Sequence, residues 1–204
     1  ITLNGALSIG GNLSINSSDN INQNANISLT TSAKTVDLLA ADSVMMHTAT
    51  TTSTTNGNIQ LIATSGNILV SQLNAGTGGV SLIATASSDN SHGNIVDADG
   101  VGAEDTSVNV TADKLIIKSG YGAASGSNHL EINVTTLATS AGLGGIFITE
   151  SNGLIVDKIT DLSINRVNTD TTIAAVAANS TKFTAEDLSV SSGLAGGDLV
   201  VKVN

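Results

Sequence analysis

Residues 57–64 read GNIQLIAT, and residues 78–85 read GGVSLIAT. The two stretches carry apolar residues in the same places, 21 positions apart. Self-similarity at a period of this size is the signature of a solenoid, in which each repeat is one coil that buries its apolar face only against its neighbours. The stretch therefore predicts a stack of coils rather than a globular core.

The same register extends toward the amino terminus. Leu13 and Val36 precede Ile59 at steps of 23 residues, so Leu13, Val36, Ile59 and Val80 form one expected column. Within each coil, short segments alternate apolar and polar residues, which is the mark of strands with one buried face. Three short strands per coil of about 20 residues predict an all-β chain folded as a parallel β-helix.

The expected organisation is a single β-solenoid over residues 1–204, with 21–23 residues per coil and roughly nine coils. The pattern weakens near residues 86–106, 120–128 and 168–182, and we expect each to leave the stack. The last of these segments fits a short helix or a hairpin. Both ends of the sequence are strand-like rather than polar caps, so we expect the stack to continue in a longer array.

Composition narrows the classes of function. The 204 residues include 21 Gly, no Cys and no Pro, and only 1% are aromatic, so Ile, Val, Leu and Ala must fill a narrow interior. The net charge of −10, with only 7 Lys and Arg, argues against a nucleic-acid partner. No apolar run is long enough to predict insertion into a membrane.

Four blocks carry a resemblance to a known family, and they read GNILV (66–70), GIFITE (145–150), INRV (164–167) and GDLVV (197–201). They resemble the repeat segments of very large bacterial surface or secreted proteins of the filamentous-haemagglutinin-like kind. That resemblance implies a right-handed β-helix and an elongated scaffold at the cell surface or outside the cell. The secretion domain of that family, with its Asn-Pro-Asn motifs, has no counterpart in this sequence.

The best candidate for a binding site is the acidic segment 97–105, which contains two glycines. Clustered carboxylates supply the hard oxygen ligands that Ca²⁺ prefers, and glycines allow the chain to wrap tightly. The segment departs from the EF-hand loop and from glycine-rich calcium repeats, and a solvated acidic turn remains the alternative. The expected calcium ligands are Asp97, Asp99, Glu104 and Asp105.

Two further sets of residues follow from the register. Leu39, Ile62 and Ile83 come directly after an expected inward residue, so alternation turns them outward as a stripe for association between chains. The alternative is a bend in the strand that lets both residues touch the core. Five asparagines at the coil turns are expected to form stacked hydrogen-bonded ladders, namely Asn12, Asn26, Asn58, Asn67 and Asn94.

Catalytic motifs are missing from the sequence. It contains no nucleophile elbow, phosphate-binding loop or dinucleotide fingerprint, and its three histidines lack metal-ligand spacing. We therefore expect no enzyme but a structural segment of an extracellular fibrous or cell-surface protein that acts by self-association. An adhesin module that binds a surface glycan or receptor through residues 89–105 or 120–128 is the alternative. A polysaccharide-cleaving β-helix fits less well, because such clefts use aromatic platforms and paired carboxylates.

Overall fold

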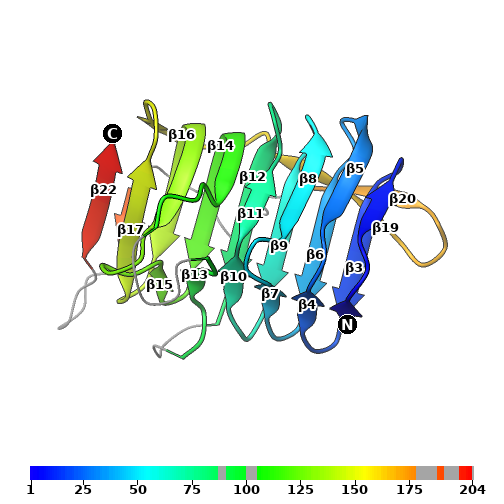
Figure 1. Ribbon diagram of the computed structural model, residues 1–204, viewed down its shortest axis with the longest axis horizontal. Coiled ribbons are helices and arrows are strands. Elements are labelled where there is room, and N and C mark those ends of the chain that lie inside the picture. The colour runs from blue at the N-terminus through cyan, green and yellow to red at the C-terminus, as the bar shows by residue number, and fades with distance from the viewer. Residues whose placement is uncertain (87–90, 100–104, 178–187, 191–197, 204) are drawn as a thin grey trace.

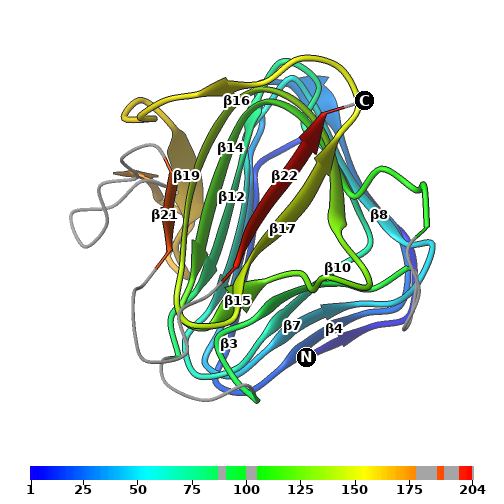
Figure 2. The same cartoon turned by 90° about the vertical axis from the view of Figure 1, so that its left-hand side faces the viewer.

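The computed structural model describes residues 1–86, 91–99, 105–177, 188–190 and 198–203. Twenty strands form one parallel sheet that winds into a β-solenoid of about six turns (Figure 1). Figure 2, which looks along the stack, shows that the coils enclose a three-sided interior. The predicted all-β solenoid is therefore confirmed. Among the described residues, no helix is long and apolar enough to cross a membrane.

Each turn contributes to three stacked columns of strands, which we call faces A, B and C. Face A contains β3 (Leu13–Ser17), β6 (Val36–Ala40), β9 (Ile59–Ala63), β12 (Gly79–Ala84) and the second halves of β14 (Val110–Ser119) and β16 (Leu130–Ala141). Face B contains β1 (Thr2–Leu3), β4 (Ile21–Gln23), β7 (Val44–Met46), β10 (Ile68–Val70), β13 (Ile95–Asp97), β15 (Gly122–Ala123) and the start of β17 (Gly145–Glu150). Face C contains β2 (Leu7–Ile9), β5 (Ile27–Ser32), β8 (Thr51–Thr55), β11 (Gln72–Asn74) and the first halves of β14 and β16. The last strands are β18 (Ile155–Val156) and β21 (Leu188–Val190), which pair with β16, and β22 (Leu199–Val203), which pairs with β17.

The pairing register reproduces the column expected from the repeat. Leu13 pairs with Val36, Val36 with Ile59 and Ile59 with Val80, and Val80 then pairs with Leu115. From Val36 onward these side chains are fully buried. Aliphatic side chains stacked like on like therefore fill the interior, which explains how the core forms with so few aromatic residues.

The glycine that opens the repeat has a steric role. A Cβ on Gly57 would lie 1.9 Å from the carbonyl oxygen of Lys34 in the coil below. A Cβ on Gly78 would likewise lie 2.4 Å from the carbonyl oxygen of Gly57. The turn into face A thus brings successive coils closer than any side chain allows.

The number of turns is smaller than the nine expected, for two reasons. Val80 pairs with Leu115, a step of 35 residues where earlier steps are 21 or 23, so residues between β12 and β14 enlarge one turn without adding another. Much of the expected excursion 86–106 lies there, and residues 87–90 and 100–104 are outside the described part of the chain. The chain also leaves the stack after β18. Within the expected excursion 120–128, β15 stays in the stack, and a turn bridged by Ser125 and Asn128 follows it.

The third expected excursion is a hairpin rather than a helix. β19 (Ser163–Val167) and β20 (Ile173–Ala177) pair antiparallel, outside the stack and beside face A (Figure 2). The block at 164–167, expected to be a repeat strand, is therefore β19 and has no place in the columns. Residues 178–182 lie outside the described part.

Residues 159–167, which we call the strap, cross face A from the fifth coil back to the first. Asp161 accepts a hydrogen bond from Lys114 (2.6 Å), and Arg166 pairs with Asp37 (Nε to Oδ2, 2.5 Å). The backbone N–H of Val167 then donates to Ser14 in the first coil (2.8 Å). The six steps from Asp161 to Val167 span about 20 Å in an extended chain, and the four coil steps from Lys114 to Ser14 span about 19 Å. A straight strap therefore fits this path.

The strap also has an apolar underside. Ile159, Leu162 and Ile164 pack with the outward residues Ile116 and Ala138 of face A. This second, smaller core shields the outer surface of face A from water where the strap lies.

Candidate metal centre and adjacent cleft

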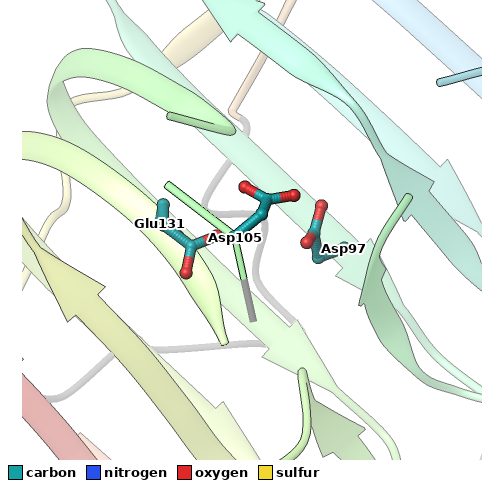
Figure 3. A group of neighbouring side chains, drawn as sticks. All are labelled: Asp97, Asp105 and Glu131. Atoms are coloured by element: carbon teal, nitrogen blue, oxygen red, sulfur yellow. The ribbon is translucent and has the colours of Figure 1, made fainter. Parts of the chain in front are cut away.

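Three carboxylates converge where face B turns into face C. Asp97 ends β13, Glu131 lies at the start of β16, and Asp105 lies in the connection between β13 and β14. One oxygen of each lies within 4.8 Å of one oxygen of the others, and Figure 3 shows the three side chains gathered around one point. Asp97 and Glu131 are buried, with 3% and 5% of their surface exposed. The cluster therefore concentrates negative charge in a place with little water.

A fully buried asparagine links two of these carboxylates. Asn109 donates from Nδ2 to Oδ1 of Asp97 (2.6 Å), and its own Oδ1 accepts the backbone N–H of Glu131 (2.8 Å). The backbone N–H of Asn109 donates in turn to the carbonyl oxygen of Glu131 (2.8 Å). Asn109 thus fixes the relative position of two coils at the cluster.

Burial raises the pKa of Asp97 above its ordinary value, because the charged form loses hydration. Hydrogen bonds from the backbone of Asp99 and the side chain of Asn109 act in the opposite direction, and the charge of Asp105 adds to the rise. A cation placed in the cluster would favour the ionised form of Asp97.

The structure brings together two of the four expected calcium ligands, Asp97 and Asp105. Asp99 is directed elsewhere, because its Oδ1 accepts hydrogen bonds from Ser71 Oγ (2.8 Å) and from the backbone N–H of Ala49 (3.0 Å). Glu104 lies outside the described residues. The sequence reading missed Glu131, whose position between the core residues Leu130 and Ile132 gave only the signal that it lies on the outer side of a strand.

A cleft of about 740 Å³ adjoins the cluster on face B. Its walls include Tyr121 and Phe147, two of the three aromatic residues in the whole chain. Polar groups of Asn94, Asp97 and Asn128 face the same space. Aromatic rings beside amide and carboxylate groups suit a ligand with apolar faces and many hydroxyl groups.

The five turn asparagines bond mainly to backbone rather than to one another. At four of these positions the side-chain Oδ1 accepts a hydrogen bond from a backbone N–H of the next coil, at 2.8–3.0 Å: Asn12 from Thr35, Asn26 from Thr51, Asn58 from Gly79 and Asn67 from Asn94. A bond between side chains is found between Asn94 and Asn67 (3.3 Å). Four of the five asparagines thus tie a turn to the next turn along the stack.

The expected outward stripe lies beside the strap. Leu39 and Ile62 are half-buried and Ile83 is 8% exposed, whereas their neighbours Leu38 and Leu61 are fully buried. None of the three stripe residues belongs to the main core cluster. Leu39 and Ile62 thus lie on the outer side of their strands, whereas Ile83 is buried outside the main core cluster.

Comparisons with known proteins identify no relative. No protein-family model, curated protein or solved structure matches the chain. Its function is therefore inferred from its own residues and geometry, because a fold alone does not fix a function.

Proposed function

We propose that the chain is a scaffold segment of an extracellular fibrous or cell-surface protein, and that it acts by stacking coil on coil. The observation that carries the proposal is the open face of the first coil. β1, β2 and β3 pair with strands on one side only within the described residues. Their inward residues are only partly buried against the core, and these are Leu3, Leu7, Ile9, Leu13 and Ile15.

The other end of the stack supports the same proposal. In β22, Leu199, Val200 and Val203 are exposed, at 48%, 38% and 52%. An exposed strand edge with apolar side chains is a template for a further strand, from the same protein or from another copy. The acidic, hydroxyl-rich exterior is consistent with a surface that faces solvent.

Ser8 allows a direct test of stacking. The N–H of Leu7 donates to the carbonyl oxygen of Asn26, so alternation along the strand points the N–H of Ser8 away from the stack. Ser8→Pro removes that outward donor and leaves the inward bonds in place. We expect chain 1–204 to form elongated assemblies in sedimentation velocity and electron microscopy, and Ser8→Pro to shift them to monomers, while Ser8→Ala does not.

Monomers of the parent chain at all concentrations would contradict stacking through this edge. Lateral association is the second route, through the stripe Leu39, Ile62 and Ile83. Ile62→Lys separates the two routes, because it charges the stripe and leaves the edge of β2 unchanged.

The cleft favours a second candidate function, a module that binds a surface glycan. Tyr121 and Phe147 would supply the platforms on which sugar rings stack, and the amides would bind hydroxyl groups. Calorimetric titration with oligosaccharides selected on a glycan array tests this. Tyr121→Ala should abolish binding, and Ile173→Ala on the distant hairpin should not. Binding that Tyr121→Ala leaves unchanged would contradict a role for the cleft.

We propose no enzymatic role. Hydrolysis of glycosides usually needs two carboxylates on either side of the scissile bond. Two carboxylates line the cleft, Asp97 and Asp198, but Asp97 is only 3% exposed and accepts a hydrogen bond from Asn109, so it is poorly placed to reach a scissile bond. Release of reducing ends from a panel of acidic polysaccharides would overturn this proposal.

A further inference from the structure

We propose that Asp97, Asp105 and Glu131, together with the side-chain carbonyl of Asn128, form a binding site for one divalent cation, best matched by Ca²⁺. The site adjoins the cleft and shares Asp97 and Asn128 with its wall, but the proposal rests on neither the scaffold nor the glycan proposal. It differs from a simple acidic loop, because its ligands come from two coils and from the connection between them.

The spacing of the carboxylates fits a calcium ion. Ca²⁺ lies about 2.4 Å from each oxygen ligand, so two ligands of one ion are separated by at most about 4.8 Å. The oxygens of Asp97, Asp105 and Glu131 satisfy that limit in every pairing. A single ion at the centre can therefore contact all three without a change in the fold.

Asn128 provides an observation that does not depend on the carboxylates. Its side chain is 8% exposed, and its Oδ1 is buried without a hydrogen-bond partner. The amide of the same side chain donates to Asp97, so the carboxamide is directed at the cluster. Rotation of the Asn128 carboxamide by half a revolution about its terminal bond exchanges the positions of its oxygen and its nitrogen. Amide carbonyls are ordinary Ca²⁺ ligands, so the ion would satisfy an oxygen that the protein leaves unpaired.

The ligand chemistry selects the class of ion. The described cluster offers only hard oxygen donors, whereas zinc and other transition metals prefer histidine or cysteine. Ligands from separate coils form an irregular set, which Ca²⁺ accepts more readily than the strictly octahedral Mg²⁺.

A bound ion would connect parts of the chain on both sides of the connection between β13 and β14. Asp97 ends the strand before it, Asp105 belongs to the connection itself, and Glu131 belongs to the next coil. The ion would therefore replace repulsion between three carboxylates by attraction to a shared charge, and would hold this connection against the stack.

The experiment uses the whole chain after dialysis against a chelator, followed by titration with CaCl₂. We expect one ion per chain in equilibrium dialysis and a rise in Tm of about 5–10 °C at a calcium concentration 100 times Kd. Tb³⁺ is a second probe, because Tyr121 is the only Tyr in a chain without Trp and lines the cleft next to Asp97. Excitation of Tyr121 should therefore sensitise Tb³⁺ emission that Ca²⁺ displaces.

The variants distinguish a cation site from a structural cluster. Glu131→Gln keeps the shape and removes one charge, so it should abolish the calcium-dependent rise in Tm while leaving the Tm of the calcium-free chain equal or higher. Asp99→Asn is the matched control, because it removes a neighbouring charge outside the ligand set and should retain the calcium response. No rise in Tm and no Tb³⁺ emission from the parent chain would overturn the proposal, as would a rise that Glu131→Gln leaves intact.

Discussion

The sharpest test of the register compares two adjacent residues of β9, Leu61 and Ile62. Leu61 is fully buried and pairs with Leu38 in the coil below and Leu82 in the coil above. Ile62 is half-buried on the outer surface of the same strand. Substituting each by alanine removes side-chain carbons from the same strand, but only Leu61→Ala opens a cavity in the core.

The magnitudes follow from burial. Loss of a fully buried leucine costs about 2–5 kcal/mol, and we expect about 3 kcal/mol because the ladders on both sides of Leu61 restrain collapse of the cavity. Ile62→Ala loses partly exposed surface and some strand propensity, about 1 kcal/mol in total. A urea m-value of about 3 kcal/mol per M then predicts a fall in midpoint of about 1 M for Leu61→Ala and about 0.3 M for Ile62→Ala.

Far-UV circular dichroism in a urea titration measures both midpoints, with the parent chain as reference. Equal shifts, or a larger shift for Ile62→Ala, would refute the assignment of Leu61 to the interior. Ile62→Lys extends the comparison, because it should remain folded while Leu61→Lys, which buries an unpaired charge, should not.

Two further predictions concern the strap. Arg166→Met leaves the carboxylate of Asp37, which is 2% exposed, without its partner. We expect a loss of about 2 kcal/mol in urea unfolding, less than for a fully buried pair because Arg166 is 32% exposed. The double variant with Asp37→Leu should recover most of this loss, and an additive loss would contradict coupling between the two residues. The hydrogen bond from Lys114 lowers the pKa of Asp161, so its contribution is present above the unfolded pKa and is lost as pH falls through the folded pKa. Because Asp161 is 66% exposed, Asp161→Asn should cost at most about 0.5 kcal/mol at pH 7 and less as the pH falls through the folded pKa. A loss that does not change with pH would exclude this ion pair as its cause.

The residues that fill the interior could be predicted because the sequence repeat itself gives the register in which successive coils pair. Ile59 and Val80 occupy equivalent positions in the sequence and pair in the structure, so no knowledge of distant contacts was needed. The strap could not be predicted in this way. Ile164 and Val167 read like another coil strand, and an alternating pattern shows that a residue is covered without showing what covers it.

The acidic site was predictable only where its residues are close in sequence. Asp97 and Asp105 are eight positions apart, and the acidic composition of that segment indicated a candidate cation site. Glu131 joins them through the pairing of β14 with β16, which brings in a residue from the next coil that no local pattern connects with Asp97. The direction of Asp99 depends on a bond to Ser71 in another coil, which no local pattern shows.

Electron microscopy of the protein from its native source is the most direct test of a scaffold built by stacked coils. We predict thin rods, longer than the roughly 30 Å that about six coils span, with an axial repeat of about 4.8 Å in their diffraction. Compact particles no longer than this one stack, at every concentration, would contradict the proposal that the coils continue beyond the open edge of β1, β2 and β3.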